Sequence, residues 1–197
     1  MKSLKNLVIF TGLAWSATTF AETKAGLFIQ AGLLYYTQSA KTPSTTGTTN
    51  TRSRATTNFN TLAGYSLGNG LALGLKYYNE TAQDGWKFSD SGSNPESKTS
   101  ALGPAVGVQL GNFAAFGSYL VIQAPENVVG SQKYSGGGGY ILDFMYLINM
   151  GGWSFGPQIS MIDFQYKKST LNGLETTIDP VIVEDFLYPY FSFFVQL

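Results

Sequence analysis

Lys76 and Asp143 are the two charged residues whose surroundings point to a special role. Each stands in a stretch where large apolar residues alternate with small or polar ones, LALGLKYY and YILDFMYLIN, and each lies on the small-and-polar side. A buried charge is costly unless it is paired. Either the two form a salt bridge that plugs and gates an interior, or each is hydrated separately. In the second case the polar partners are expected among Gln109, Gln158 and Tyr119.

Other residues that could do chemistry are scarce. The chain has no histidine and no cysteine, so no serine has the usual imidazole base and no Cys/His cluster can hold zinc. A catalytic pair of carboxylates would need a second acid besides Asp143 in the predicted strands. The run Gly136–Gly139 lacks the Lys-Ser/Thr and the helix of a phosphate loop. We expect no enzymatic activity, no cofactor and no metal site.

The first 21 residues are typical of a secretory signal peptide. Lys2 and Lys5 make the start positive, residues 7–15 form a short apolar run, and Thr19-Phe20-Ala21 matches a small-x-small cleavage site. The apolar run is too short to cross a bilayer as a helix. We expect cleavage after this site, so that residues 22–197 form the exported domain.

The composition of that domain excludes several classes of protein. Without Lys2 and Lys5, ten basic residues face twelve acidic ones, which argues against a nucleic-acid partner. The lack of cysteine excludes a disulfide framework. Charged residues make up 12% of the chain, against about 25% in a typical soluble domain. Stability must therefore come from the predicted sheet and its surroundings.

Eight stretches with a period of two predict β-strands. Each has about the 9–11 residues that a tilted strand needs to cross a bilayer. They are Ala25–Tyr36, Asn58–Leu67, Leu71–Tyr78, Ala101–Leu110, Phe113–Ile122, Tyr140–Asn149, Trp153–Ile162 and Phe186–Leu197. An even number of strands places both ends of the chain on the same side of a membrane.

Short turns and long polar segments alternate between these strands. The short turns have the composition of tight hairpins and are Gly68-Asn69-Gly70, Gly111-Asn112 and Gly151-Gly152. The long segments, which we expect to be loops, are Thr37–Thr57, Asn79–Thr99, Gln123–Gly139 and Lys167–Asp185. Transmembrane barrels have this asymmetry, with short periplasmic turns and longer outer loops.

One face of the predicted strands is large, apolar and uncharged, which favours a membrane barrel over a soluble one. A soluble barrel also alternates, but its outer face must be hydrated. Here both strand charges, Lys76 and Asp143, lie on the other face. Lipid favours such an uncharged face, because a midplane Lys or Arg costs about 2–4 kcal/mol.

Aromatic residues and prolines give two local expectations. Aromatic residues near the strand ends suit two interfacial girdles. They are Tyr35, Tyr36, Tyr65, Tyr77, Tyr78, Trp153, Tyr188 and Tyr190. Proline removes a ladder hydrogen bond, so we expect a β-bulge at Pro104 and another at Pro157.

The last twelve residues, FLYPYFSFFVQL, form an alternating strand that ends with the sequence given. The large apolar positions are Phe191, Phe193, Val195 and Leu197. The stretch resembles the C-terminal strand of Gram-negative outer-membrane barrels, which the barrel-assembly machinery reads during insertion. Those strands usually finish in Phe or Trp, and Leu197 departs from that pattern. The resemblance implies that these four side chains face lipid and act as the assembly signal.

Residues 22–197 as a whole resemble the small outer-membrane barrels of the OmpA, OmpX and OmpW type. The resemblance rests on architecture rather than on a short motif. It implies an all-β, eight-stranded, antiparallel, up-and-down transmembrane β-barrel in the outer membrane of a Gram-negative bacterium, with both termini periplasmic. The implied partners are outer-membrane lipids, lipopolysaccharide and the barrel-assembly machinery, and we expect a monomer.

Two functions remain open for such a barrel. The first is a structural or surface-interaction role through long extracellular loops, with the interior largely filled, because eight strands leave room only for side chains. The second is a narrow channel for small apolar molecules, as the OmpW-like members suggest. Glycines on the small-and-polar face thin the lining and favour this alternative, although they also ease curvature and close packing.

Overall fold

The computed structural model describes residues 24–43, 49–86, 96–129 and 132–197, which form a closed antiparallel barrel. Every described element is a strand, so the all-β prediction is confirmed. No helix in these ranges is long and apolar enough to cross a membrane. The predicted signal peptide, residues 1–21, lies outside the described residues.

Nine strand elements follow one another along the described chain. They are β1 (Ala25–Pro43), β2 (Thr49–Leu67), β3 (Leu71–Trp86), β4 (Glu96–Leu110), β5 (Phe113–Val129), β6 (Gln132–Tyr146), β7 (Ile148–Asn149), β8 (Trp153–Leu171) and β9 (Leu174–Gln196). β6 and β7 are two parts of one strand that is interrupted at Leu147, and both parts pair with β8. The nine elements therefore make eight strands around the barrel, as predicted.

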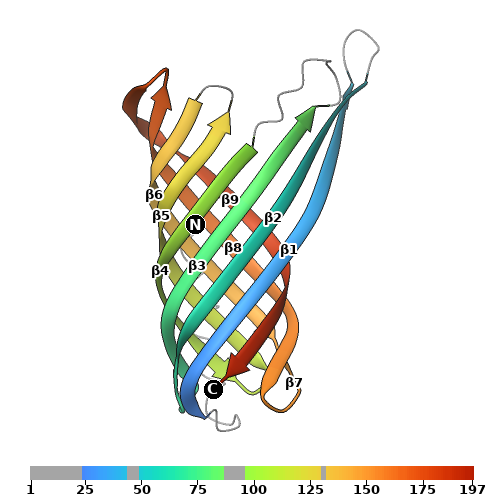
Figure 1. Ribbon diagram of the computed structural model, residues 1–197, viewed down its shortest axis with the longest axis vertical. Coiled ribbons are helices and arrows are strands. Elements are labelled where there is room, and N and C mark those ends of the chain that lie inside the picture. The colour runs from blue at the N-terminus through green and yellow to red at the C-terminus, as the bar shows by residue number, and fades with distance from the viewer. Residues whose placement is uncertain (1–23, 44–48, 87–95, 130–131) are drawn as a thin grey trace, which may run out of the picture.

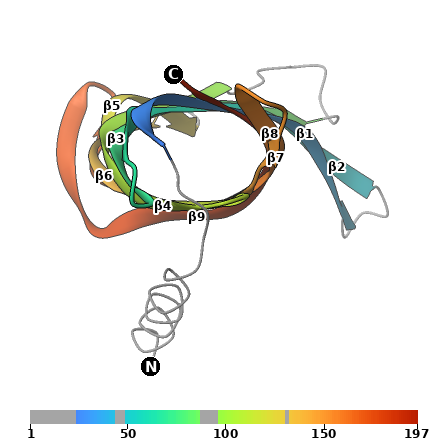
Figure 2. The same cartoon turned by 90° about the horizontal axis from the view of Figure 1, so that it is seen from below.

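Sequence neighbours pair with one another around the ring, and β1 pairs with β9 to close it. The short connections between β2 and β3 and between β4 and β5 lie at the end where β1 begins and β9 ends (Figure 1). We call this the lower end. Figure 2 shows the closed ring from below. Ala25 and Leu197 thus lie at the same end of the barrel.

The strands extend well beyond their predicted ends. β1 reaches Pro43 and β2 starts at Thr49, so most of Thr37–Thr57 is a paired hairpin. The same holds for the other three segments expected to be loops, Asn79–Thr99, Gln123–Gly139 and Lys167–Asp185. The prediction of four long loops is therefore wrong over most of their length. Ladder hydrogen bonds need no apolar side chain, so pairing continues where the apolar alternation stops.

Along each strand, successive side chains point alternately to the outside of the barrel and to its interior. The exposed large apolar residues form what we call the apolar belt: Leu27, Ile29, Leu33, Leu73, Leu75, Val106, Ile159, Met161, Leu187, Phe191 and Phe193. Their neighbours in sequence point inward and are smaller or polar at many positions. Within the described residues the belt carries no charge below Asp163, which is partly exposed on the outer face of β8.

Two inward phenylalanines pack where glycine leaves room on a neighbouring strand. A Cβ at Gly64 would lie 2.7 Å from the ring of Phe28, and one at Gly107 would lie 2.3 Å from the ring of Phe116. Each ring therefore occupies the space of a missing side chain. Close packing, rather than an open lining, explains these two glycines.

The aromatic residues divide between the two faces, which corrects the predicted girdles. Tyr36, Tyr78, Tyr188 and Tyr190 are directed inward and pack in the upper interior. Among the described residues, the exposed tyrosines and tryptophan are Tyr35, Tyr65, Tyr77, Tyr119, Tyr140, Tyr146 and Trp153. Adjacent tyrosines such as Tyr35 and Tyr36 cannot share a face of a strand, so a cluster in sequence splits across the barrel wall.

The prolines do not produce the expected bulges. Pro104 pairs with Leu75, and Pro157 pairs with Phe191, without a register shift at either position. The ladder between β4 and β5 simply has no pair at Gly103 and Pro104. The register instead shifts higher on the barrel, beginning at Ser100/Ala101 between β4 and β5. The bulge prediction is therefore wrong for both prolines.

Candidate functional site inside the barrel

A layer of buried polar side chains crosses the middle of the interior. We call it the polar layer; it contains Gln30, Asn60, Lys76, Asp143, Gln158, Ser160 and Ser192. These residues come from β1, β2, β3, β6, β8 and β9. The alternation along each strand points these side chains inward, and the register between strands places them at the same height in the barrel. Six of the eight strands thus meet in one hydrogen-bonded group.

The layer is built around Lys76 and Asp143, which form a salt bridge. Lys76 Nζ lies 2.6 Å from Asp143 Oδ2, and the two side chains are 0% and 1% exposed. Lys76 Nζ also donates to Asn60 Oδ1 at 3.1 Å. The first of the two alternatives raised by the sequence, direct pairing across the interior, is the one that the structure has.

The second carboxylate oxygen of Asp143 is held by β8. Gln158 Nε2 donates to Asp143 Oδ1 at 2.8 Å, and Ser160 Oγ donates to the same atom at 2.6 Å. Asp143 therefore receives hydrogen bonds from three side chains. Such satisfaction of the remaining lone pairs is what a buried ion pair needs if it is to offset its desolvation.

Gln30 joins the ion pair to the strands that close the barrel. Its Nε2 lies within hydrogen-bonding distance of Asn60 Oδ1, Gln158 Oε1 and Ser192 Oγ, at 3.2, 2.9 and 2.9 Å. Gln30 is on β1 and Ser192 is on β9, so this contact crosses the closing seam. The polar layer therefore ties closure of the ring to the pairing of Lys76 with Asp143.

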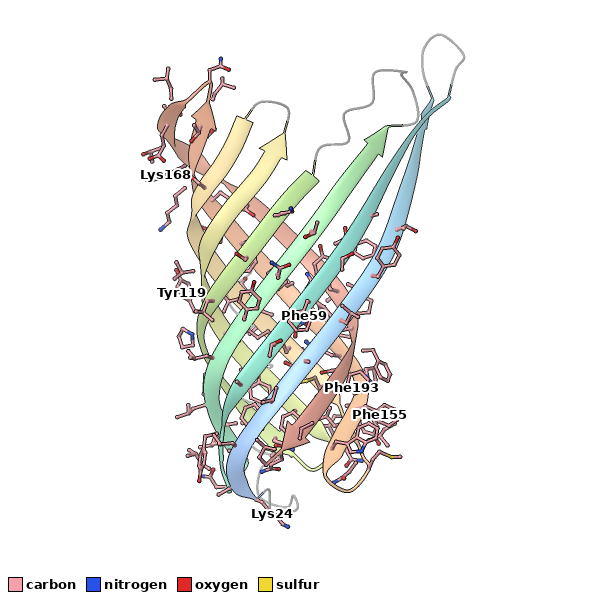
Figure 3. All side chains as sticks on the ribbon, in the orientation of Figure 1. Lys24, Phe59, Tyr119, Phe155, Lys168 and Phe193 are labelled. Atoms are coloured by element: carbon pink, nitrogen blue, oxygen red, sulfur yellow. The ribbon has the colours of Figure 1, made fainter. Side chains whose placement is uncertain are left out.

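Of the polar partners suggested by the sequence, one is present and two are elsewhere. Gln158 contacts Asp143 directly. Tyr119 is 59% exposed and lies on the outside of the barrel, as Figure 3 shows. Gln109 is at the lower end, where its backbone N–H donates to the carbonyl of Gly70. Tyr119 was misplaced because the pattern of β5 leaves its parity ambiguous.

Apolar clusters lie below and above the polar layer. The lower cluster is Phe28, Leu62, Ala72, Ala105, Ala114, Phe116, Met145, Leu147 and Phe194. Its rings stack, with Phe28 and Phe194 centroids 5.1 Å apart. The upper cluster is Tyr78, Ala101, Leu120, Ile122, Ile141, Ile162, Phe164, Tyr166, Tyr188 and Tyr190. Side chains therefore pack the interior at three successive levels.

A buried carboxylate that the sequence reasoning missed lies beside the upper cluster. Glu80 is 5% exposed and accepts hydrogen bonds from Tyr78 OH at 2.8 Å and from Asn58 Nδ2 at 3.2 Å. The predicted strand stopped at Tyr78 and placed Glu80 in a loop. Glu80 has the same parity as Lys76 and Tyr78, so extending the alternation by one step would have found it.

Three of the four residues proposed as an assembly signal project from the outer face of β9, and the fourth, Leu197, directly follows the strand. Phe191, Phe193, Val195 and Leu197 are 48%, 50%, 38% and 74% exposed. Phe193 lies opposite Phe155 of β8, and Figure 3 shows both rings on the outside near the lower end. Trp153 stacks on Phe155 with centroids 5.6 Å apart. Together they form an aromatic patch at one edge of the belt.

The interior of the barrel is filled by this hydrogen-bonded layer and by the two apolar clusters. The layer pairs its acid with a cation and surrounds both with neutral donors and acceptors. Among the described residues, no group of three or more His, Cys, Asp or Glu side chains could hold a metal ion. Comparison with known proteins gave no match: no family model, no curated protein and no solved structure matches the chain.

Proposed function

We propose that this chain is an integral outer-membrane barrel with a packed interior and a structural or surface-interaction role at its upper end. The observation that carries the proposal is the apolar belt. Large apolar side chains around the barrel are about half exposed, among them Leu27 at 58%, Leu75 at 58% and Ile159 at 49%. In water this would be a very large exposed patch, whereas the hydrocarbon of a bilayer favours it.

The closed ring supports the same proposal. A bilayer cannot satisfy exposed backbone N–H and C=O groups, so strands cross it only as closed barrels. Here the ring is closed at the level of the belt by the pairing of β1 with β9, from Phe28↔Gln196 to Leu33↔Phe191. On this proposal lipid and lipopolysaccharide surround the belt, the barrel-assembly machinery inserts the chain, and the barrel is a monomer with both termini periplasmic.

The packed interior favours this role over the narrow-channel alternative. Lys76 and Asp143 have almost no accessible surface, and apolar clusters lie on both sides of them. A molecule that passed from end to end would have to separate a buried ion pair. We also propose that the barrel has no catalytic activity, which assays of the purified protein for hydrolysis of lipids and peptides would test.

Cell fractionation and gel mobility test the proposed location. The chain, expressed with its own first 21 residues in a Gram-negative host, should be found in the outer-membrane fraction. Unheated, it should migrate on denaturing gels as a compact folded band that shifts on boiling. Recovery of the protein as a soluble periplasmic monomer would end the membrane proposal.

A further inference from the structure

A second group of polar side chains lies on the inner face of β1, β2 and β3, above the polar layer. The register places Leu34, Asn58 and Glu80 at one level across these three strands. It pairs Tyr36 with Thr56 at the next level up. Asn58, Thr56 and Glu80 are buried, whereas Leu34 and Tyr36 are only partly buried. The three polar side chains are therefore approached from the side of β1.

Two oxygen atoms of this group have no hydrogen-bond partner within the part of the chain that the structure describes. They are Asn58 Oδ1 and Thr56 Oγ1, and both residues are 0% exposed. The amide of Asn58 is fixed, because its Nδ2 donates to Tyr78 OH at 2.6 Å and to Glu80 Oε2 at 3.2 Å. An amide oxygen only accepts, and a buried acceptor that lacks a donor destabilises the fold. The group thus offers acceptors to a donor from outside the chain.

The polar layer shows which donor such acceptors suit. There Lys76 Nζ contacts a carboxylate oxygen, Asp143 Oδ2, at 2.6 Å and an amide oxygen, Asn60 Oδ1, at 3.1 Å. The upper group supplies the same two kinds of acceptor, the carboxylate of Glu80 and the amide oxygen of Asn58. These two residues are directly opposite each other on β3 and β2. The barrel's own ammonium site therefore has a counterpart higher in the interior.

We propose that Glu80, Asn58 and Thr56 bind the ammonium group of a small primary alkylamine. Its three N–H groups match three acceptors, namely a carboxylate, an amide oxygen and a hydroxyl oxygen. One ammonium charge also matches one carboxylate, whereas a divalent cation would bring an uncompensated charge into the interior. The inference goes beyond the proposed function, because the site belongs to the folded barrel whether or not the barrel lies in a membrane.

Tyr36 and Leu34 supply the contact for the alkyl part of the ligand. β1 and β9 pair only as far as Leu33↔Phe191, so Tyr36 lies beyond that ladder. Its ring packs against Tyr188, with the two centroids 5.7 Å apart. We expect the ligand to displace the ring of Tyr36, to place its ammonium group among the buried acceptors and to leave its alkyl chain against Leu34.

Three variants test the acceptors. Thr56→Val removes the hydroxyl, keeps nearly the same shape and breaks no hydrogen bond among the described residues, since Thr56 Oγ1 has no partner there. Ser66→Ala is the matched control, because Ser66 Oγ is likewise buried without a partner but lies near the lower end, opposite Gly26. Glu80→Gln removes the charge of the carboxylate and keeps its size.

The probe is n-propylammonium, titrated into isotope-labelled barrel in an uncharged detergent. The side-chain amide signal of Asn58 in the nuclear magnetic resonance spectrum reports binding at the site itself. Three further solutes are titrated into the unaltered barrel. n-Propanol has the same chain without the charge, tetramethylammonium has the charge without an N–H group, and sodium chloride supplies a monatomic cation.

We expect n-propylammonium to shift the Asn58 signal in a saturable way. Thr56→Val and Glu80→Gln should each weaken binding by at least about tenfold, or roughly 1.4 kcal/mol, and Ser66→Ala should leave it unchanged. The unfolding midpoint of the ligand-free Thr56→Val barrel should not fall, because its hydroxyl has no partner to lose. None of the three further solutes should displace the amine at equal concentration.

Several results would overturn the inference. Equal binding of the amine by Thr56→Val would remove the hydroxyl from the site. Equal binding of tetramethylammonium or n-propanol would show contact with the rings and no donation to the acceptors. Displacement by sodium chloride would assign the site to a monatomic cation. Absence of a saturable shift in a barrel that is folded, as judged by its shift on boiling, would leave only water at these oxygens. The comparisons among solutes use the unaltered barrel and do not depend on the folding of any variant.

Discussion

At Asp143, one carboxylate is shared between a cation and two neutral donors from β8. Its Oδ2 contacts Lys76 Nζ at 2.6 Å, and its Oδ1 accepts from Gln158 and Ser160. Removing one partner of a buried ion pair leaves the other charge uncompensated, which costs more than the pair itself contributes. The effect of a substitution here therefore depends on which charge is left behind.

Asp143→Asn should destabilise the barrel and loosen the plug. The variant keeps the shape of the side chain but leaves Lys76 buried without its counter-ion, so we expect a loss of about 3–5 kcal/mol in the free energy of unfolding. Small-ion conductance should rise as the layer opens. Guanidinium unfolding in detergent and planar-bilayer recordings measure the two effects.

The double variant Lys76→Met with Asp143→Leu is the control for that prediction. Replacing both charges with apolar residues of similar volume is often neutral or stabilising, so stability should return toward the original value while the interior stays closed. If Asp143→Asn alone matched the original barrel in both stability and conductance, the salt bridge would have no part in closing the interior.

Gly107→Ala tests the packing of rings against glycine. Its added Cβ would lie 2.3 Å from the ring of Phe116 and 2.4 Å from the carbonyl oxygen of Ala115. We expect a loss of about 1–3 kcal/mol from overpacking. Gly117→Ala is the matched control, because its Cβ would meet only Leu142, at 3.5 Å. Equal unfolding midpoints for the two variants would count against the close packing.

At the scale of the strands, the sequence predicts which stretches cross the belt but not where the strands end. Period-two alternation marked all eight strands, because the belt forces an apolar residue at every second position. Beyond the belt the regular apolar alternation in the sequence stops, and the ladder still continues. Residues such as Glu80 and Asp163 were missed for this reason. The hydrogen bond between Gln30 and Ser192 forms only when β1 pairs with β9. The pattern within a single stretch of sequence does not predict this long-range pairing.

Phe193→Asp should block insertion of the chain. Phe193 is 50% exposed within the aromatic patch of β8 and β9, and a carboxylate there would have to enter hydrocarbon. We expect loss of the protein from the outer-membrane fraction, measured by immunoblot of fractionated cells. Phe193→Leu, which keeps an apolar side chain, should insert. Normal membrane levels of the Asp variant would mean that β9 faces lipid with its other side.

For the whole molecule, three packed levels of side chains predict an electrically silent barrel. The lower cluster, the polar layer and the upper cluster each fill part of the interior, and the ion pair lies in the middle level. We expect the unaltered protein in a planar bilayer to give no steady single-channel current above the baseline of protein-free bilayers. A stable, reproducible conductance would favour the narrow-channel alternative and would mean that the packed interior opens.

The ion pair also constrains the order of events by which the barrel is made. Lys76 and Asp143 are separated by 67 residues, and the strands that carry them are not neighbours in the ring. A chain that entered the membrane one hairpin at a time would carry the ammonium group of Lys76 into hydrocarbon long before its partner arrived. Non-local contacts of this kind form late, because the intervening chain must be ordered first. The burial of Lys76 therefore favours an assembly pathway in which the hairpins first gather at the membrane surface and then insert together.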